Sequence, residues 1–403
     1  MSRLDEILAK SRLDPDDLVV LLGADAPAEQ SRVRAAAYAV KACVVGRVVY
    51  FRGLFELSNL CTKDCLYCGI RRSNQNLGRY TIPVDEILTG ARWAHQQGYG
   101  SVVLQSGERS DPAFVDLVTE LVTKIRALSH DELVITLSMG EQSEATYRTW
   151  FQAGAERYLL RIETSDPALY RQLHPADHSW ERRRDCLRLL HSIGYQLGSG
   201  VMIGLPGQSV EQLARDIVFF EQEKVVMIGM GPFIPHGETP LRDVIRNFAW
   251  KRRAQLALAL RMIAATRLYL PDVNIAAATA LQTLAPDGRE QGLMAGANVI
   301  MPNLTDPKYR GSYQLYDGKP CLDESATQCR GCLEGRITSL GETIGFGLRG
   351  DSRRFLDRKI GAATGLAGPT GQPRVAENMQ GKGEGAETQD RGRRRESGVN
   401  NSK

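Results

Sequence analysis

The sequence predicts an α/β fold, a closed (β/α)8 barrel of the TIM type, and two observations lead to this prediction. Short apolar runs alternate with amphipathic helices of about ten to fifteen residues, which is typical of parallel strands joined by helices. The chain has 403 residues, of which 42% are hydrophobic and 24% charged, as expected for one large barrel with extensions around a sizeable core.

Residues 1–45 are expected to form a helical extension before the barrel. Asp5-Glu6-Ile7-Leu8 has helical periodicity. Asp14-Pro15-Asp16-Asp17 places a proline and acidic residues where the first turn of a second helix would begin. The barrel itself is then expected over residues 46–305.

Eight segments of the expected barrel have the length and composition of strands, and each leads into a loop with polar or glycine residues. They cover residues 48–57, 101–105, 134–138, 158–162, 196–203, 225–229, 274–278 and 297–301. In such barrels the active site lies at the carboxyl ends of the strands. The alanine-rich seventh segment has weak β propensity, so an incomplete barrel remains the alternative.

The C-terminal part is expected to contain an extension over residues 306–358 and a disordered tail over 359–403. The last 43 residues contain no aromatic side chain and are rich in Gly, Glu and Arg, so they cannot bury a core. No run approaches the roughly 20 apolar residues that span a bilayer. The net charge of +4 comes largely from basic residues near the C-terminus, and we do not interpret it as a nucleic-acid surface. We expect a cytoplasmic protein without membrane or nucleic-acid partners.

Three cysteines directly after the first strand form the pattern C-x3-C-x2-C: Cys61, Cys65 and Cys68. Thiolates are the soft ligands of iron-sulfur clusters, and three of them can hold three irons of a [4Fe-4S] cube while the fourth iron stays open. Half of a structural zinc site is the alternative, although zinc prefers four ligands, commonly in C-x2-C pairs.

A second group of cysteines lies in the expected C-terminal extension. Cys321, Cys329 and Cys332 have the spacing C-x7-C-x2-C. This spacing can hold a second iron-sulfur cluster, and zinc with a fourth ligand remains the alternative.

Charged residues at the ends of other strands are candidates for ligand binding. Arg161 and Glu163 alternate at the end of the fourth strand and should share one face, where they would be costly to bury unless they are paired or hold a ligand. Arg183, in the next helix, could bind a carboxylate with its planar fork. Because Arg182 and Arg184 flank it, a solvated helix charge is the alternative.

The cysteine motif, with Tyr67 before its last cysteine, resembles that of the radical SAM superfamily. In that superfamily the open iron binds the amino and carboxylate groups of S-adenosylmethionine (SAM), and reductive cleavage gives methionine and a 5'-deoxyadenosyl radical. The resemblance implies that Tyr67 packs by the adenine and that Ser106-Gly107-Glu108 is a variant of the Gly-Gly-Glu segment that meets the amino group. The full set of implied SAM contacts is Tyr67, Gln105, Ser106, Gly107, Glu108, Ser138, Arg161, Glu163, Arg183 and Met202.

Within the superfamily, the chain closely resembles the HydE family of [FeFe]-hydrogenase maturases, over roughly residues 30–358. The motifs that carry the resemblance are Cys61 to Cys68 followed by Gly69-Ile70-Arg71-Arg72, 104–108, 157–161, Gly204-Leu205-Pro206-Gly207-Gln208, 231–236, 298–303 and the second cysteine triad. The family usually has Arg-His-Glu-Thr at the fourth strand, whereas Ile162 takes the place of the histidine here. Strand alternation should turn Ile162 away from Arg161 and Glu163.

The resemblance implies a radical SAM (β/α)8 barrel with a large cavity and a second cluster, [2Fe-2S] or [4Fe-4S], at the C-terminal triad. It also implies an organometallic iron-carbonyl-cyanide-cysteine substrate delivered by HydG, a product that goes to HydF, and a reductant such as ferredoxin or flavodoxin. Two alternatives stay open. One is a radical SAM mutase or sulfur-insertion enzyme related to PylB or biotin synthase, and the other is a scaffold protein with zinc at both triads.

Overall fold

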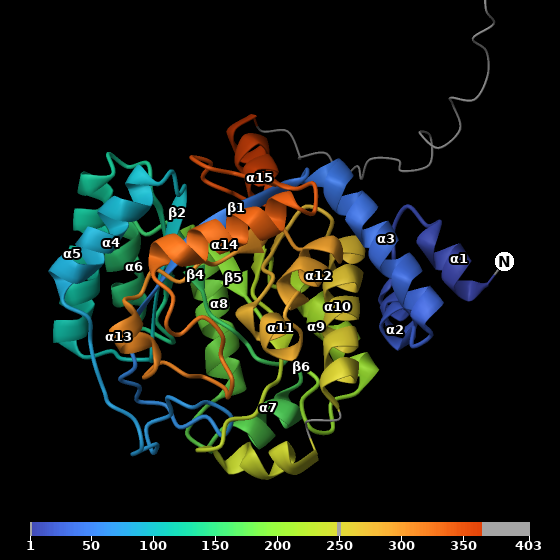
Figure 1. The fold of residues 1–403 in the computed structure, drawn as a ribbon, viewed down its shortest axis with the longest axis horizontal. Coiled ribbons are helices and arrows are strands. Elements are labelled where there is room, and N and C mark those ends of the chain that lie inside the picture. Colours follow the sequence, from blue (N-terminus) through green and yellow to red (C-terminus); the bar gives the residue numbers. More distant parts are fainter. Residues whose placement is uncertain (1, 248–250, 365–403) are drawn as a thin grey trace, which may run out of the picture.

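The computed structural model describes residues 2–247 and 251–364 (Figure 1). Eight parallel strands form a sheet in the order β10-β1-β2-β3-β4-β5-β7-β9. Their bounds are β1 (Val48–Ser58), β2 (Ser101–Ser106), β3 (Val134–Ser138), β4 (Arg157–Leu159), β5 (Gln196–Ser199), β7 (Met227–Ile228), β9 (Asn274–Ile275) and β10 (Val299–Ile300).

The sheet curls until its two edge strands meet. A parallel bridge joins Ala276 to Val299. The N–H of Ala277 donates to the carbonyl of Val299 over 2.9 Å, and that of Asn298 donates to Ile275 over 2.9 Å. The predicted (β/α)8 fold class is therefore confirmed. The longest runs of paired residues join β1 to β2 and β2 to β3. The pairings of β10 with β1 and of β7 with β9 are much shorter, and a single bridge joins the segments at β9 and β10.

The fourth to eighth strands are all shorter than the sequence predicts. The fifth and sixth are also interrupted, so β6 (Met202–Ile203) and β8 (Gly231–Pro232) pair with each other in a separate small sheet. At the interruption the chain passes so close to its neighbour that a Cβ on Gly200 would collide with the carbonyl of Gly229. This close approach of two backbones needs glycine, and the regular ladder ends there.

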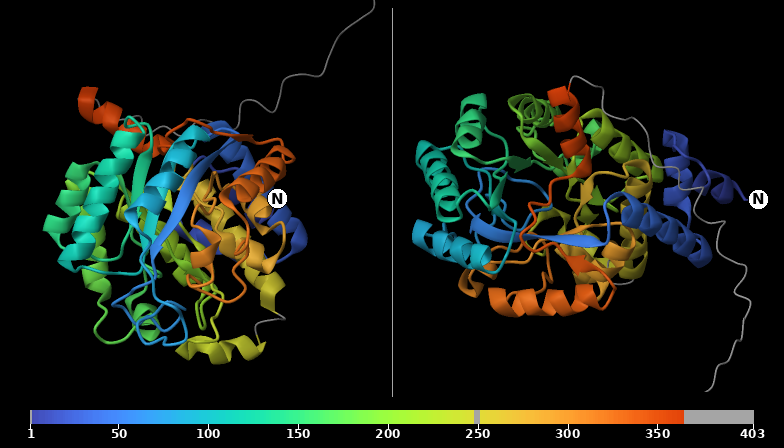
Figure 2. Two further views of the ribbon diagram at one scale, coloured as in Figure 1. Left: turned by 60° about the vertical axis from the view of Figure 1, so that its left-hand side comes forward. Right: turned by 90° about the horizontal axis from the view of Figure 1, so that it is seen from above.

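Helices surround the strands, as the view from above shows (Figure 2). Ser143, Ser179 and Ser209 begin three of them by accepting a hydrogen bond from a backbone N–H in the first turn. The helices of the ring are α4 (Val84–Gln96), α5 (Pro112–Leu128), α6 (Glu144–Ala153), α8 (Trp180–Ile193), α9 (Val210–Gln222), α10 (Arg252–Tyr269), α11 (Thr279–Leu284) and α12 (Gly288–Met294). The short helix α7 (Pro167–Leu173) and the 3-10 helix η1 (Pro240–Asn247) lie below the barrel in Figure 1.

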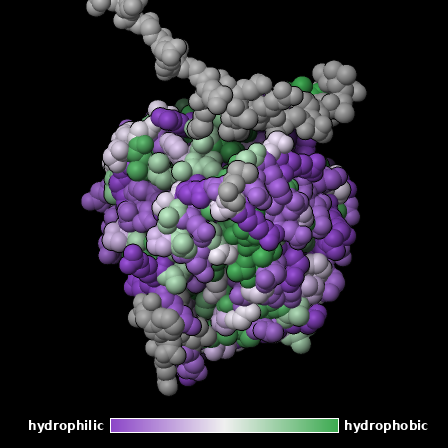
Figure 3. All heavy atoms as spheres, turned by 90° about the vertical axis from the view of Figure 1, so that its right-hand side faces the viewer, coloured by the Kyte–Doolittle hydropathy of each residue, from purple (hydrophilic) through white to green (hydrophobic). Residues whose placement is uncertain are grey.

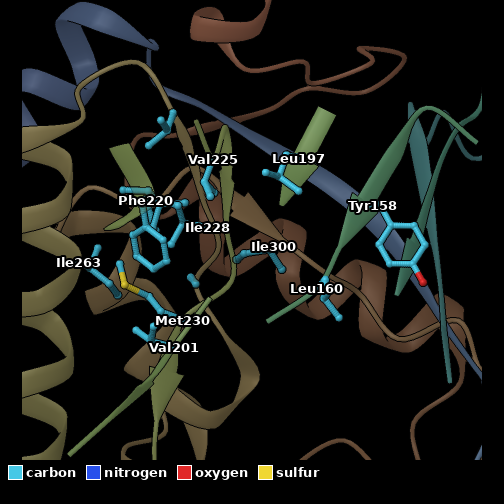
Figure 4. Close-up of a cluster of buried hydrophobic side chains, with 14 of the residues drawn as sticks. Tyr158, Leu160, Leu197, Val201, Phe220, Val225, Ile228, Met230, Ile263 and Ile300 are labelled. Carbon is cyan, nitrogen blue, oxygen red and sulfur yellow. The ribbon is translucent and has the colours of Figure 1, made fainter. Parts of the chain in front are cut away.

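The core lies between the strands and this ring of helices. Leu197 of β5 and Ile228 of β7 lie with Phe220 of α9 and Ile263 of α10 in one cluster of buried apolar side chains (Figure 4). Because side chains alternate along a strand, the residues before and after Leu197 and Ile228 point into the barrel. Several of these inner side chains are polar, and Arg52, Thr136 and Asn274 line a narrow cavity there.

Three helices precede the barrel: α1 (Arg3–Leu8), α2 (Pro15–Gly23) and α3 (Pro27–Val44). The second of them contacts α9, and the third contacts α10. Figure 3 shows this side of the molecule, where apolar side chains form patches within a largely hydrophilic surface. In the part of the chain that the structure describes, no helix is long and apolar enough to cross a membrane.

The C-terminal extension runs from one end of the barrel to the other. It contains α13 (Pro307–Arg310), α14 (Ala326–Thr338), β11 (Thr343–Ile344), which pairs with β1, and α15 (Arg353–Thr364). Between β11 and α15 the chain crosses the amino-terminal end of the barrel. There the carbonyl of Gly350 accepts from Arg52 and Asn274, and Asp351 binds Arg157 and Gln196. The boundary expected at 358 falls within α15, and residues 365–403 of the expected tail lie outside the described residues.

Candidate active site

The first cysteine triad lies in the long segment between β1 and α4, at the carboxyl ends of the strands. This segment is the blue loop below the barrel in Figure 1. Burial raises the pKa of the Cys65 thiol to about 12, while the nearby Arg183 lowers it and Cys61 raises it. Burial also raises the pKa of Cys68, with Cys65 and Cys61 as further causes. The three thiols lie within one segment of eight residues, and bound iron would have to hold them as thiolates.

Charged contacts fix the segment that contains the triad. Asp64 accepts from Nε of Arg71 over 2.7 Å and from the N–H of Ser73 over 3.0 Å. Its own N–H donates to Nε2 of His178 over 3.3 Å. On the other side, Nζ of Lys63 lies 3.3 Å from Oε1 of Glu108. Lys63 and Asp64, which lie inside the motif, thus tie the cysteine segment to partners outside it.

The segment after β2 packs directly on the first cysteine. The backbone N–H of Glu108 donates to Sγ of Cys61 over 3.4 Å, and the N–H of Gly107 donates to the carbonyl of Ser58 over 2.8 Å. A Cβ on Gly107 would collide with the carbonyl of Leu60 and lie 2.8 Å from the Cβ of Cys61. Only glycine lets these two segments meet this closely. Ser106 lies beside them, with its Oγ donating to the carbonyl of Gly107 over 2.6 Å.

Arg161 and Glu163 lie on one face after β4, as the sequence predicts. Nη2 of Arg161 is 3.0 Å from Oε2 of Glu163. The two atoms are close enough for an ion pair, but their angles are not those of a hydrogen bond. Oε2 of Glu163 is therefore buried without a hydrogen-bond partner among the described residues, and Nε of Arg161 is too. Glu163 also has a left-handed backbone, with φ of 67°. Strain and unsatisfied polar atoms of this kind are typical of a place where a ligand binds.

Ile162, between these two charges, is fully buried in the main apolar cluster. Its side chain therefore lies away from the Arg161–Glu163 pair, as strand alternation predicts. The position that is histidine in the resembling family contributes to packing here.

Arg183 is buried, so its alternative interpretation as a solvated helix charge is wrong. Its Nε donates to Oε1 of Glu141 over 2.6 Å, and its Nη1 donates to the carbonyl of Arg161 over 3.0 Å. Its Nη2 lies 3.7 Å from Oε2 of Glu108. The side chain of Arg182, one residue earlier, is 65% exposed. The two arginines therefore differ in burial because of their positions around the helix.

Tyr67 and Met202 meet in a second, smaller apolar cluster. Tyr67 packs against a group that consists of Leu169, Leu173, Met202, Leu205 and Phe233. Its hydroxyl lies 3.2 Å from Nε2 of His174. This cluster offers a flat aromatic side chain and apolar neighbours directly beside Cys68, as a purine base would require.

Gln105 and Ser138 lie next to each other in register at the ends of β2 and β3. Nε2 of Gln105 donates to the hydroxyl of Tyr313 over 3.2 Å. The structure thus places all the implied SAM contacts at the carboxyl end of the barrel, on β2, β3, β6, α8 and the segments that follow β1, β2 and β4.

The residues present fit a [4Fe-4S] cluster with SAM. In residues 2–247 and 251–364, no three His, Cys, Asp or Glu side chains converge as they would around a single ion. The three thiolates of a cube bind three different irons and therefore stand farther apart. A buried oxygen of Glu163 without a hydrogen-bond partner among the described residues, the Arg183 guanidinium and the apolar cluster around Tyr67 have the chemistry that an ammonium group, a carboxylate and a purine would need.

The second triad lies on and before α14. Cys329 is buried in the main core and Cys332 is exposed, one turn farther along the same helix. Burial raises the pKa of Cys321, and Arg289 lowers it. Nη2 of Arg289 lies 4.0 Å from its sulfur. Cys321 has a left-handed backbone with φ of 62°, a conformation that costs a non-glycine residue energy.

Several residues of this site have no signal in the sequence. Glu141, His174 and His178 belong to no recognisable motif, and Lys63 is not one of the residue types that define the cysteine motif, yet each contacts the cysteine segment or its neighbours. Only the position of Lys63 within the cysteine motif could have drawn attention to it.

Comparison with known proteins agrees with this site. The Radical SAM superfamily model matches residues 55–220. The [FeFe] hydrogenase maturase subunit HydE of Thermotoga maritima is 45% identical over 312 residues, which cover 77% of this chain and 86% of that protein. The crystal structure of methylornithine synthase (PylB) has a TM-score of 0.72 at 24% identity, covering 86% of this chain and 98% of that one. The maturase HydG from Carboxydothermus hydrogenoformans has a TM-score of 0.69 at 18% identity, covering 85% and 79%.

The barrel, the cysteine segment at its carboxyl end and the matching domain define a protein of the radical SAM superfamily. Such proteins bind a [4Fe-4S] cluster and SAM. Within the superfamily, the chain belongs to the HydE family of [FeFe]-hydrogenase maturases.

Proposed function

We propose that this protein uses Cys61, Cys65 and Cys68 to bind a [4Fe-4S] cluster, cleaves SAM reductively, and acts on an iron-carbonyl-cyanide-cysteine species during assembly of the [FeFe]-hydrogenase active site. When bound, the cluster supplies the one electron that splits SAM into methionine and a 5'-deoxyadenosyl radical. The observation that carries the proposal is the contact of the Gly107–Glu108 backbone with Cys61. It brings the segment expected to meet the SAM amine onto the first cluster ligand.

Each part of SAM has a counterpart among the residues at this end of the barrel. Oε2 of Glu163 is buried beside Arg161 without a hydrogen-bond partner among the described residues, so it can accept from an ammonium group. Arg183 presents Nη2 to a carboxylate. Tyr67 and Met202 pack by the adenine and exclude water from it. The backbone at Gly107 leaves room for the amino-acid end because no side chain fills it.

The substrate and partners rest on the relationship to HydE. An anionic organometallic species suits the cations inside the barrel, where Arg161 lies near the mouth and Arg52 lies deeper. We propose delivery by a HydG-type maturase, transfer of the product to a HydF-type scaffold, and reduction by a ferredoxin or flavodoxin. The second triad, Cys321, Cys329 and Cys332, would bind a further [2Fe-2S] or [4Fe-4S] cluster.

The decisive experiment is anaerobic reconstitution with iron and sulfide, followed by EPR of the reduced protein with and without SAM. We expect SAM to change the [4Fe-4S] signal, and 5'-deoxyadenosine to form with dithionite. A Cys65→Ala protein should show neither. Formation of 5'-deoxyadenosine by that variant would refute the role of the triad.

The substrate is tested separately. Purified protein should restore hydrogenase activity to an extract of a host that lacks its HydE-type maturase. Turnover of lysine or dethiobiotin without such rescue would instead favour a mutase or sulfur-insertion enzyme of the PylB or biotin synthase type. Zinc without acid-labile sulfide after anaerobic purification would favour a scaffold.

A further inference from the structure

We infer that Glu141, at the start of the segment after β3, is a positioning residue for SAM, since it aims Arg183 at the ligand and anchors the cysteine segment at the same time. The inference rests on the proposed binding of SAM. It concerns a residue that belongs to no motif and that touches neither a thiol nor the groups expected to hold the adenine.

Glu141 lies at the centre of a group of buried charges. Its side chain is 2% exposed. Oε1 accepts from Nε of Arg183 over 2.6 Å, and Oε2 accepts from Nε of Arg182 over 3.1 Å. Oε2 also lies 3.5 Å from Nζ of Lys63. Glu141 is thus shared between the helix that contains Arg183 and the segment that contains the cysteines.

These contacts determine which N–H groups of Arg183 can still donate to a ligand. Nε donates to Glu141, and Nη1 donates one hydrogen to the carbonyl of Arg161. Nη2 lies 3.7 Å from Glu108, beyond hydrogen-bond distance. Because a guanidinium is planar, fixing the Nε edge also fixes the direction of the Nη2 edge. The free edge therefore faces the side of Glu108 and Cys65, where the SAM carboxylate is proposed to bind.

The same carboxylate acts on the cysteine segment. Lys63 lies between Cys61 and Cys65 in the sequence and pairs with both Glu108 and Glu141. The backbone N–H of Glu141 in turn donates to Oε2 of Glu108 over 2.9 Å. Without the charge of Glu141, Glu108 would be the one carboxylate among the described residues that Arg183 and Lys63 share. Arg183 would then turn toward Glu108 and lose the orientation that suits SAM.

Glu223 provides a matched control. It is buried to the same degree, with a side chain 4% exposed, and it also binds two arginines of α8. Arg184 donates to it over 2.7 Å and Arg188 over 3.0 Å. In the part of the chain that the structure describes, no hydrogen bond or ion pair joins either arginine to the cysteine segment. A loss of SAM affinity that comes only from breaking an ion pair to α8 should therefore appear in both variants.

The experiment compares Glu141→Gln and Glu223→Gln as reconstituted proteins. Iron and sulfide content and the melting temperature report on integrity, and titration of the reduced cluster with SAM, followed by EPR, reports on binding. We expect Glu141→Gln to weaken SAM binding roughly tenfold or more, with a matching rise in KM for SAM cleavage. Glu223→Gln should bind SAM like the wild type although its melting temperature falls. Glu141→Asp, which keeps the charge, should recover part of the affinity.

The outcomes separate this inference from the proposed function. Equal SAM affinity in Glu141→Gln and the wild type, or an equal loss in both Gln variants, would overturn the positioning role. If Glu141→Gln does not fold, unchanged affinity in Glu141→Asp would overturn it as well. A wild-type protein whose cluster does not respond to SAM would refute the proposed function itself.

Discussion

The backbone N–H of Glu108 lies 3.4 Å from Sγ of Cys61, so the turn after β2 is a direct neighbour of the first cysteine. The two segments are 47 residues apart in the sequence. They meet because parallel strands β1 and β2 end side by side. The absence of a side chain at Gly107 makes this contact close.

Gly107→Ala should reduce loading of the [4Fe-4S] cluster. The new methyl group would meet the carbonyl of Leu60 and the Cβ of Cys61, and backbone cannot yield as a flexible side chain can. We expect a cost of about 1–3 kcal/mol, relieved by displacement of Cys61. Iron and sulfide content after reconstitution measures the effect. Gly23→Ala, where a Cβ would meet nothing within 4 Å, serves as the control and should load normally.

Ile162→His should lower stability without changing SAM cleavage per cluster. Ile162 is fully buried among apolar side chains, and a buried imidazole would cost about 1–3 kcal/mol unless it finds a partner. Chemical unfolding and 5'-deoxyadenosine formation test the two halves of this prediction. Ile162→Val should cost only about 0.5–1.5 kcal/mol. A changed cleavage rate in Ile162→His would mean that this position does reach the ligand.

Asp216 should make stability fall as the pH rises toward neutrality. Burial raises the pKa of this carboxyl from 3.8 to about 7. Between these values the folded protein holds a proton that the unfolded chain has released, so the free energy of unfolding decreases with increasing pH. From about pH 5 to about pH 7 this change amounts to about 2 kcal/mol.

Asp216→Asn should remove this dependence. The variant keeps an oxygen that can accept from the N–H of Ser165, as Oδ1 of Asp216 does over 2.6 Å. Urea unfolding of wild type and variant at the two pH values gives the comparison. The free energy of unfolding of the variant should rise relative to that of the wild type as the pH increases. A difference in free energy of unfolding that is the same at both pH values would show that Asp216 does not titrate in this range.

Cys329→Ala should leave SAM cleavage largely intact. Cys329 lies on α14, in the C-terminal extension, whereas the groups proposed to hold SAM lie at the carboxyl ends of the barrel strands. Its buried side chain contributes to the core, so a modest loss of stability of about 1 kcal/mol is expected. Formation of 5'-deoxyadenosine, compared with that of Cys65→Ala, measures the outcome. Cleavage at background level would mean that the second triad carries electrons or holds the barrel together.

The strands of the barrel could be predicted because each is a short apolar run between turn residues. All eight expected segments overlap a strand, including the alanine-rich seventh, where Asn274 and Ile275 form β9. The interruptions after β5 and β7 could not be predicted. They depend on how closely Gly200 approaches Gly229, which is a property of the closed sheet and not of either segment.

The parts of the site that have a fixed spacing in the sequence could be predicted. The parts made by residues that only the fold brings together could not. Three thiols in one short segment indicate a cluster on their own. Arg182, Arg183 and Arg184 look alike in the sequence, and only the register of α8 buries the middle one. Glu141 is an ordinary carboxylate until the fold brings Lys63 and Arg183 to it.

Gly350 and Asp351 close the end of the barrel opposite the cysteines through their bonds to Arg52 and Arg157. A reactant inside the barrel would therefore enter and leave past the segments that contain Cys61 and Glu108. Product would have to wait behind methionine and 5'-deoxyadenosine until these depart. By covering the amino-terminal end, the C-terminal extension would in this way set the order of release, with the products of SAM leaving before the product in the barrel.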